Sequence, residues 1–209
     1  SLWNTVGSRE TSKIIVNITK RQQDILVGTV LGDGYLQKTG LKNARLRLEH
    51  GEKQREYLLW KGRQFPRLFS TKAKRIRRIH PKTKQTYIYW RWQSNASPEL
   101  GKWQSLFYKN GVKHIPETLG GLMQDPLVLA VWYMDDGYYS PLQKHSFIYL
   151  GRVLSAEADI ARHAIAKNFK IKTRIYNKKE KGFALFFPVQ ETIKLHALIR
   201  EHVIPSMNY

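Results

Sequence analysis

The sequence has no cysteine, and only 16 of its 209 residues are acidic, against 36 lysines and arginines. Without cysteine, a disulfide framework and a thiolate zinc site are both excluded. We expect a reducing, intracellular setting such as an organelle matrix or a prokaryotic cytoplasm. Long apolar runs are missing too. The longest, residues 127–134, is far shorter than the ~20 residues that span a bilayer, so no membrane partner is expected.

Other absences narrow the chemistry. No Gly-Lys-Ser/Thr loop for phosphate occurs, which argues against ATP dependence, and the seven histidines have no metal-ligand spacing. What the chain has in excess is positive charge, a formal +20, together with 6 Trp, 11 Tyr and 8 Phe. A hydrophobic fraction of 42% supports a packed core rather than a disordered basic tail. A folded protein with this charge is expected to bind a polyanion, and nucleic acid is the leading partner.

Two segments of the chain are alike. Residues 26–34 read LVGTVLGDG and residues 129–137 read LAVWYMDDG, and a tyrosine follows each. Their aspartates, Asp33 and Asp136, are 103 residues apart, about half the chain. Each segment is apolar and of helical length, and the Asp-Gly at its end predicts a helix stop.

The hydrophobic pattern after each segment repeats as well and predicts an α+β fold of two pseudo-symmetric αββαββα halves. The halves are expected at 22–110 and 126–209, with 111–125 as the connecting segment. In the first half the predicted order is strands 35–38 and 44–50, helix 52–68, strands 72–80 and 86–94, and helix 98–109. In the second half it is strands 138–140 and 146–154, helix 156–169, strands 172–176 and 183–187, and helix 189–202.

The two aspartates end helices, where unpaired carbonyl groups already carry about half a negative charge. Bringing Asp33 and Asp136 together would concentrate that charge, and a divalent cation with oxygen ligands would relieve it; Mg²⁺ is the natural candidate. A single Asp-Gly more often marks only a turn between helix and strand, but its repetition favours the metal. Gly28 and Gly32 share one face of the first helix, which favours close approach by another helix.

The two segments resemble the nine-residue signature of the LAGLIDADG homing endonucleases, in particular the single-chain members with two signatures. The resemblance implies that the signature helices pack together and that antiparallel sheets form a DNA-binding saddle. The eighth signature position falls on Asp33 and Asp136, which are expected to be catalytic and to bind metal. Backbone carbonyls of the preceding residues, Gly32 and Asp135, are expected to help hold the ions. Mg²⁺ is the expected cofactor, with Mn²⁺ substituting and Ca²⁺ supporting binding without efficient cleavage.

A lysine adds to the resemblance. Residues 113–116 read KHIP, similar to a Lys-x-Ile-Pro stretch of the family whose lysine lies in the active site. Lys113 is therefore expected to order water or to stabilise charge on the phosphate, and an ordinary exposed lysine is the alternative. In the second half, similar proteins carry a lysine directly after the tyrosine that corresponds to Tyr209, where the present sequence ends.

The resemblance implies a monomeric, sequence-specific endonuclease that breaks both strands of double-stranded DNA, leaves short 3′ overhangs and mobilises an intron. An alternative of another class is an RNA-binding maturase of the same family, which would bind intron RNA with little or no nuclease activity. Retention of Asp33 and Asp136 favours the enzyme, because a binding protein does not need metal-binding carboxylates. A basic transcription factor on the same scaffold is a third alternative.

Positive charge concentrates on the predicted hairpins, since residues 40–95 hold 16 basic and 3 acidic side chains. A two-stranded ribbon fits the major groove, where bidentate arginine reads guanine and glutamine reads adenine. A solvated charged face is the alternative for each residue singly. The candidates for base reading are Arg45, Arg47, Arg75, Arg77, Arg91, Gln93, Arg152, Lys172, Arg174 and Tyr176. The candidates for phosphate contact are Lys82, Lys84, Lys178, Lys179 and Lys181. The tryptophans expected to pack inside rather than to stack on bases are Trp60, Trp90, Trp92 and Trp103.

Overall fold

A computed structural model describes residues 17–208 and confirms the α+β prediction. Each half contains a four-stranded antiparallel sheet, with strand orders β1-β2-β4-β3 and β7-β8-β10-β9. The two orders are equivalent, because in each sheet the two hairpins meet through their second strands. The first sheet comprises β1 (Tyr35–Lys38), β2 (Ala44–Gly51), β3 (Lys74–Ile79) and β4 (Thr86–Gln93). The second comprises β7 (Gly137–Tyr139), β8 (Ser146–Gly151), β9 (Arg174–Asn177) and β10 (Phe183–Phe187).

Each half also contains α-helices. They are α1 (Lys20–Leu31), α2 (Arg55–Arg63), α3 (Pro98–Phe107), α4 (Leu119–Leu122), α5 (Pro126–Asp136), α6 (Ser155–Phe169) and α7 (Val189–Ile199). Thr19, Ser97 and Asp125 begin α1, α3 and α5 by accepting backbone N–H groups of the first turn, which satisfies donors that have no helical partner. Within residues 17–208, no helix combines the length and the apolar character that crossing a membrane would need.

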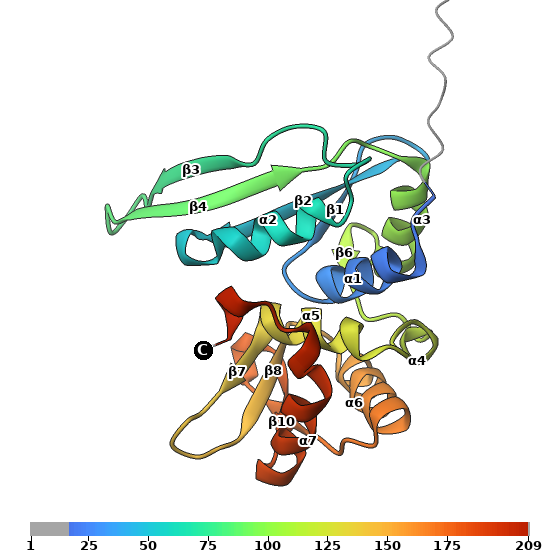
Figure 1. Ribbon diagram of the computed structural model, residues 1–209, viewed down its shortest axis with the longest axis vertical. Coiled ribbons are helices and arrows are strands. Elements are labelled where there is room, and N and C mark those ends of the chain that lie inside the picture. The colour runs from blue at the N-terminus through green and yellow to red at the C-terminus, as the bar shows by residue number, and fades with distance from the viewer. Residues whose placement is uncertain (1–16, 209) are drawn as a thin grey trace, which may run out of the picture.

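The signature helices α1 and α5 pack against each other between the two halves (Figure 1). Gly28 permits this approach, because a Cβ there would lie 2.6 Å from the carbonyl oxygen of Val128 and 2.7 Å from Cβ of Val131. The close approach predicted from Gly28 is confirmed. A larger residue on α5 thus fills the space that glycine leaves on α1.

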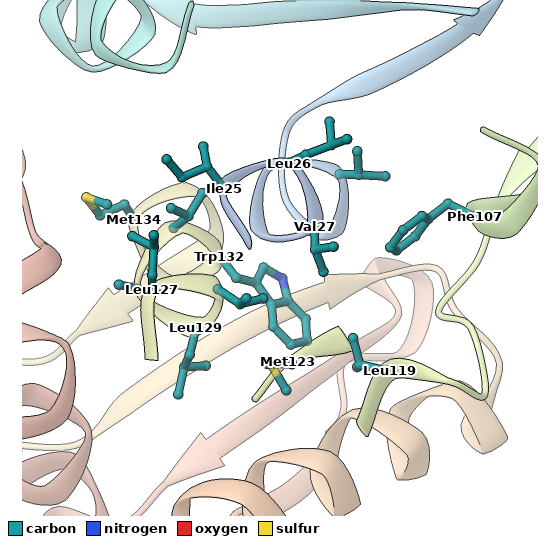
Figure 2. Packing of buried hydrophobic residues seen from close by; sticks show 14 of the residues in the cluster. Ile25, Leu26, Val27, Phe107, Leu119, Met123, Leu127, Leu129, Trp132 and Met134 are labelled. Atoms are coloured by element: carbon teal, nitrogen blue, oxygen red, sulfur yellow. The ribbon is translucent and has the colours of Figure 1, made fainter. Parts of the chain in front are cut away.

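A continuous apolar core holds the two halves together. Figure 2 shows Trp132 of α5 below Val27 of α1, with Met123 next to it. All three side chains are 1% exposed or less. Burying a side chain of this kind contributes about 1.5–3 kcal/mol, so the halves are expected to unfold together rather than separately.

Several predicted boundaries are wrong, and the local sequence explains why. The helix predicted over 52–68 is a 3₁₀ turn, η1 (Glu52–Gln54), followed by α2, which ends at Arg63. Pro66 disfavours helical geometry at the residue before it, which explains the early stop. The helix predicted over 98–109 ends at Phe107, because the next residues form a short hairpin of β5 (Tyr108–Lys109) and β6 (Val112–Lys113).

The connecting segment predicted over 111–125 carries β6 and α4, and is therefore more structured than a simple linker. The remaining boundaries differ from prediction by three residues or fewer. Three further 3₁₀ turns occur in the second half: η2 (Lys179–Lys181), η3 (Arg200–His202) and η4 (Pro205–Met207).

Candidate active site

The two signature aspartates leave their helices differently. Helix α5 ends at Asp136 itself, whereas α1 ends at Leu31, so Asp33 lies two residues beyond its helix. The backbone of Gly32 adopts φ −90° and ψ −128°, outside the helical region. The prediction that each aspartate lies in the last turn of its helix is confirmed for Asp136. It is wrong for Asp33, because the chain leaves helical geometry at Gly32, one residue before Asp33.

The structure brings the two aspartates into one electrostatic centre. Burial raises the pKa of Asp136 from 3.8 to about 8, and the charges of Asp33 and Asp135 add to the effect. Burial and Asp135 also raise the pKa of Asp33 to about 6, although Lys61 and Lys113 lower it. Burial and repulsion among the aspartates together thus outweigh the attraction of the two lysines at Asp33 and Asp136.

Lys113 lies at this centre. Its ammonium group donates to the carbonyl oxygens of Gly32 at 2.8 Å and Gly34 at 3.0 Å. Burial lowers the pKa of Lys113, while the charges of the three aspartates raise it. The alternative of an ordinary exposed lysine is therefore wrong. The carbonyl of Gly32, which is predicted to help hold metal, accepts a hydrogen bond from Lys113.

A buried ion pair that crosses between the halves adjoins the two signature aspartates. The Lys61 ammonium of α2 lies 2.6 Å from Oδ1 of Asp135 in α5, and the two side chains are 1% and 0% exposed. The Tyr57 hydroxyl donates to the same oxygen at 2.7 Å. Oδ2 accepts the backbone N–H of Asp33 at 2.9 Å. Asp135 therefore fixes the turn that carries Asp33.

Gly32 leaves the room that the Asp135 carboxylate occupies. A Cβ at residue 32 would overlap both the carboxylate and Cβ of Asp135. The two residues at position seven of the signatures are therefore matched. Gly32, which follows α1, has no side chain, and the carboxylate of Asp135 in α5 fills the space.

His50 of β2 extends the buried cluster. Its Nε2 lies 3.1 Å from the Lys61 ammonium, and its Nδ1 lies 3.0 Å from Oε1 of Gln54. An ammonium group can only donate, so Nε2 is the acceptor, and the ring proton is on Nδ1. Burial and the charge of Lys61 lower the pKa of His50 to about 4, which leaves the ring neutral near pH 7. Nδ1 is also 3.8 Å from Oδ2 of Asp33.

The donor groups of this centre fit a divalent cation. Ligand atoms of Asp33, His50 and Asp135 lie within 4.8 Å of one another, but the Lys61 ammonium already supplies a positive charge to that trio. Asp136 is different, because no hydrogen bond or ion pair among residues 17–208 engages its carboxylate. Oxygen donors with uncompensated charge are what Mg²⁺ and Ca²⁺ prefer. Asp33 and Asp136 are therefore the residues best placed to hold such an ion.

One face of the first sheet gathers polar side chains. Along β2, Leu46 and Leu48 are buried in the core, so the alternating Arg45, Arg47 and Glu49 lie on the opposite face. Strand register extends this face across β1, β3 and β4. The polar members at the centre of this face, here called the polar face, are Gln37, Arg45, Arg47, Glu49, Lys74, Arg91 and Gln93, and Tyr35, Ile76, Arg78, Tyr87 and Tyr89 lie on the same side of the sheet. The Arg91 guanidinium lies 2.6 Å from Glu49, and that of Arg45 donates to Gln37 at 2.8 Å.

Two kinds of known protein are similar to this chain in sequence. The chain is 25% identical over 232 residues to protein RecA of Mycobacterium shimoidei, which covers 99% of this chain and 51% of that protein. It is 25% identical over 207 residues to probable intron-encoded endonuclease 1 of Wickerhamomyces canadensis, covering 96% and 88% of the two chains. The chain thus spans about half the length of the RecA proteins it matches.

Solved structures share the fold. The homing endonuclease I-WcaI bound to its DNA recognition sequence has a TM-score of 0.86 at 24% identity, covering 98% of this chain and 94% of that one. I-DmoI, solved with DNA in the presence of Mn, Mg or Ca, has TM-scores of 0.58, 0.52 and 0.56 at 14%, 12% and 15% identity. These structures cover 87–90% of this chain and 95–98% of their own. Residues 23–195 match the LAGLIDADG DNA endonuclease family.

This chain belongs to that family. The LAGLIDADG signature by itself identifies Asp33 and Asp136, but not the cluster of Tyr57, Lys61 and His50 around Asp135. A weaker signal for that cluster exists in the sequence. His50 continues the period-2 row of core positions on its strand, and Lys61 follows Tyr57 by four residues on one helix face. A lysine at a core position calls for a buried anion.

Two of the predicted base-reading arginines lie on the wrong face of the LAGLIDADG sheet. Arg75 pairs with Trp90 and Arg77 with Ile88, on the side opposite the polar face. The Arg75 guanidinium is 2.9 Å from Glu52. The prediction that Arg75 and Arg77 lie on the same face as Arg45 is therefore wrong, because a shift of one residue along a strand moves a side chain to the other face.

The other candidate DNA contacts are placed as follows. Arg45, Arg47, Arg91 and Gln93 share the polar face, as predicted. Arg174 and Tyr176 are exposed on β9, whereas Lys172 precedes β9 and Arg152 follows β8, so neither of these two is on a strand. The exposed turn lysines are Lys82, Lys84, Lys179 and Lys181. Lys178 is half-buried, with its ammonium 4.6 Å from the Phe147 ring centroid.

The four tryptophans pack as predicted. Trp60, Trp90, Trp92 and Trp103 are partly buried against the main core. Tyr209, after which similar proteins carry a second lysine, lies outside the described residues.

Proposed function

We propose that this chain is a monomeric, sequence-specific endonuclease that cuts both strands of a DNA duplex and leaves short 3′ overhangs. The observation that carries the proposal is the pair of carboxylates with raised pKa, Asp33 and Asp136, beside Lys113 at the junction of two pseudo-symmetric halves. Two related sites match a substrate whose two strands must both be hydrolysed.

Duplex DNA is supported as the substrate by charge and shape. The formal charge of +20 and the arginine-rich polar face would displace counterions from phosphates. A β-ribbon fits the major groove. The structurally similar I-WcaI is described as bound to its DNA recognition sequence.

In the proposed mechanism, Asp33 and Asp136 would hold divalent cations. The I-DmoI structures obtained with Mg, Mn or Ca support a divalent ion, and we propose Mg²⁺ as the active one, Mn²⁺ as a substitute and Ca²⁺ as supporting binding alone. When bound, the cation supplies Lewis-acid activation of water and offsets charge on the phosphate.

The remaining residues position and balance charge. Lys113, oriented by the carbonyls of Gly32 and Gly34, places a positive charge where negative charge develops on the phosphate. Asp135 holds the Asp33 turn through the backbone N–H of Asp33, and Lys61 pairs with the Asp135 carboxylate and orients it. Neutral His50 accepts a hydrogen bond from Lys61 and leaves the net charge unchanged.

The test is cleavage of a randomised duplex library in Mg²⁺, with sequencing of the cut ends. Asp33→Asn and Asp136→Asn are expected to retain binding in Ca²⁺ and to lose double-strand cutting. Asp159→Asn, which changes an exposed aspartate of α6, is the matched control and is expected to cut normally. Wild-type cutting by the Asp33 or Asp136 variant would refute the assignment. Tight binding of intron RNA by a chain that never cuts a duplex would favour the maturase.

A further inference from the structure

At five equivalent positions in their central rows, the outer faces of the two sheets carry different chemistry. Tyr35 and Tyr138 each follow a signature segment and so align the two strand registers. One row of paired residues runs Tyr35, Arg47, Gln93 in the first sheet and Tyr138, Phe147, Phe186 in the second. The next row runs Glu49, Arg91, Lys74 in the first sheet and Tyr149, Ala184, Tyr176 in the second. The five charged or amide side chains in these rows, Arg47, Gln93, Glu49, Arg91 and Lys74, therefore each have an apolar or aromatic counterpart.

Four of these counterparts form one cluster, here called the aromatic face: Phe147, Tyr149, Tyr176 and Phe186. The ring centroids of Phe147 and Phe186 are 5.1 Å apart, and Tyr176 stacks on Phe186 at 4.8 Å. Phe147 is 8% exposed although it lies outside the main core, so its neighbours in the cluster bury it. Tyr149 and Tyr176 remain 43% and 38% exposed. The aromatic face is preformed and open to a ligand.

The surroundings of the aromatic face indicate that the ligand is DNA. Tyr138, which pairs with Phe147, is two residues from Asp136, so the face continues the surface that leads away from the active site. The Lys178 ammonium lies 4.6 Å from the Phe147 ring, and Arg174 pairs with Phe186, which gives the cluster a cationic rim. Cations at the rim match phosphates on either side of a groove.

We propose that the aromatic face reads thymine methyl groups, so that the half-site under the second sheet is rich in thymine while the polar face reads its half-site by hydrogen bonds. The inference rests on the proposed DNA-binding function. In the major groove thymine is distinguished by its methyl group, which is recognised by apolar contact, whereas arginine and glutamine read purines through paired hydrogen bonds. The rings of Phe147 and Phe186 have no donors or acceptors, so hydrogen-bond reading is unavailable to them.

The test removes methyl groups and nothing else. Duplexes bound in Ca²⁺ are selected from a randomised library, and the thymines of one half-site at a time are replaced by deoxyuridine. We expect the dissociation constant to rise about fourfold per contacted methyl in one half-site, which corresponds to about 0.8 kcal/mol per buried carbon, and to stay unchanged in the other. Equal effects in both half-sites, or none in either, would overturn the inference. Duplexes that are bound but never cut in Mg²⁺ would overturn the nuclease proposal and leave this inference standing.

A pair of variants assigns the effect to the aromatic face. Tyr176→Ala is expected to reduce the deoxyuridine effect in the thymine-rich half-site. The matched control is Tyr35→Ala, which removes a tyrosine of similar exposure, 42%, from the first sheet and is expected to leave that effect unchanged. An unchanged effect in Tyr176→Ala, or an equal reduction in both variants, would contradict the assignment.

Discussion

The Asp136→Asn variant is expected to be more stable than wild type when no divalent cation is present, although it should not cut DNA. The Asp136 carboxylate is half-buried, and no hydrogen bond or ion pair among residues 17–208 engages it. Burial, with the charges of Asp33 and Asp135, raises its pKa from 3.8 to about 8, against the opposing effect of Lys113 and Lys61. At pH 7 this difference corresponds to a cost of up to about 4 kcal/mol, which the neutral amide would remove.

The size of the effect depends on pH. The folded protein holds the Asp136 proton more tightly than the unfolded chain does, so the carboxylate costs nothing below pH 3.8, where both states are protonated. The cost grows as the pH rises and is complete above about pH 8. The stability advantage of Asp136→Asn should therefore be small near pH 4 and largest near pH 8.

The assay is urea unfolding of both proteins in EDTA across this pH range, with Asp159→Asn as the control for loss of an exposed carboxylate. Adding Mg²⁺ should then stabilise wild type and reduce the advantage of the variant, because a ligand that binds only the folded state adds to its stability. A variant that is no more stable than wild type at any pH would refute the reasoning about uncompensated charge.

Three further outcomes follow from the same geometry. Lys61→Met should destabilise the protein by about 3–5 kcal/mol, because it leaves Asp135 charged and buried, and adding Asp135→Leu should restore much of this in urea unfolding. Arg47→Ala should change which bases are tolerated in a cleavage selection, whereas Arg75→Ala on the opposite face should not. The logarithm of DNA affinity should fall steeply with the logarithm of salt concentration, measured by fluorescence anisotropy, and a slope near zero would remove the basic side chains from the interface.

The repeat of two apolar segments ending in Asp-Gly was enough to predict the paired halves, the sheets and the central helices. These features depend on local periodicity, which sequence displays directly. Helix ends were less predictable. The stops of α1 and α2 depend on single residues, Gly32 and Pro66, whose effect extends only over a turn.

The site could be predicted from the sequence where a residue belongs to a short motif with a known role, as Asp33, Asp136 and Lys113 do. The cluster of Lys61, Tyr57, His50 and Asp135 was not, because it joins residues from three separate elements and its partners lie up to 78 residues apart. Face assignment on β3 failed for a related reason. Lys74 and Arg75 are both basic, so charge alone does not show which residue lies on the polar face and which lies on the opposite face. Only the pairing of Arg75 with Trp90 of β4 assigns the two residues to their faces.

The matched pair of Gly32 and Asp135 makes the two halves non-interchangeable. Two copies of the first half would leave Lys61 without its anion, and two copies of the second would oppose two Asp135 carboxylates at the helix crossing. A symmetric homodimer of either half would therefore lack the pairing that the two different halves make. Chimaeras that join one of these halves to a foreign one would therefore need residues 32, 61 and 135 to be transferred as a set.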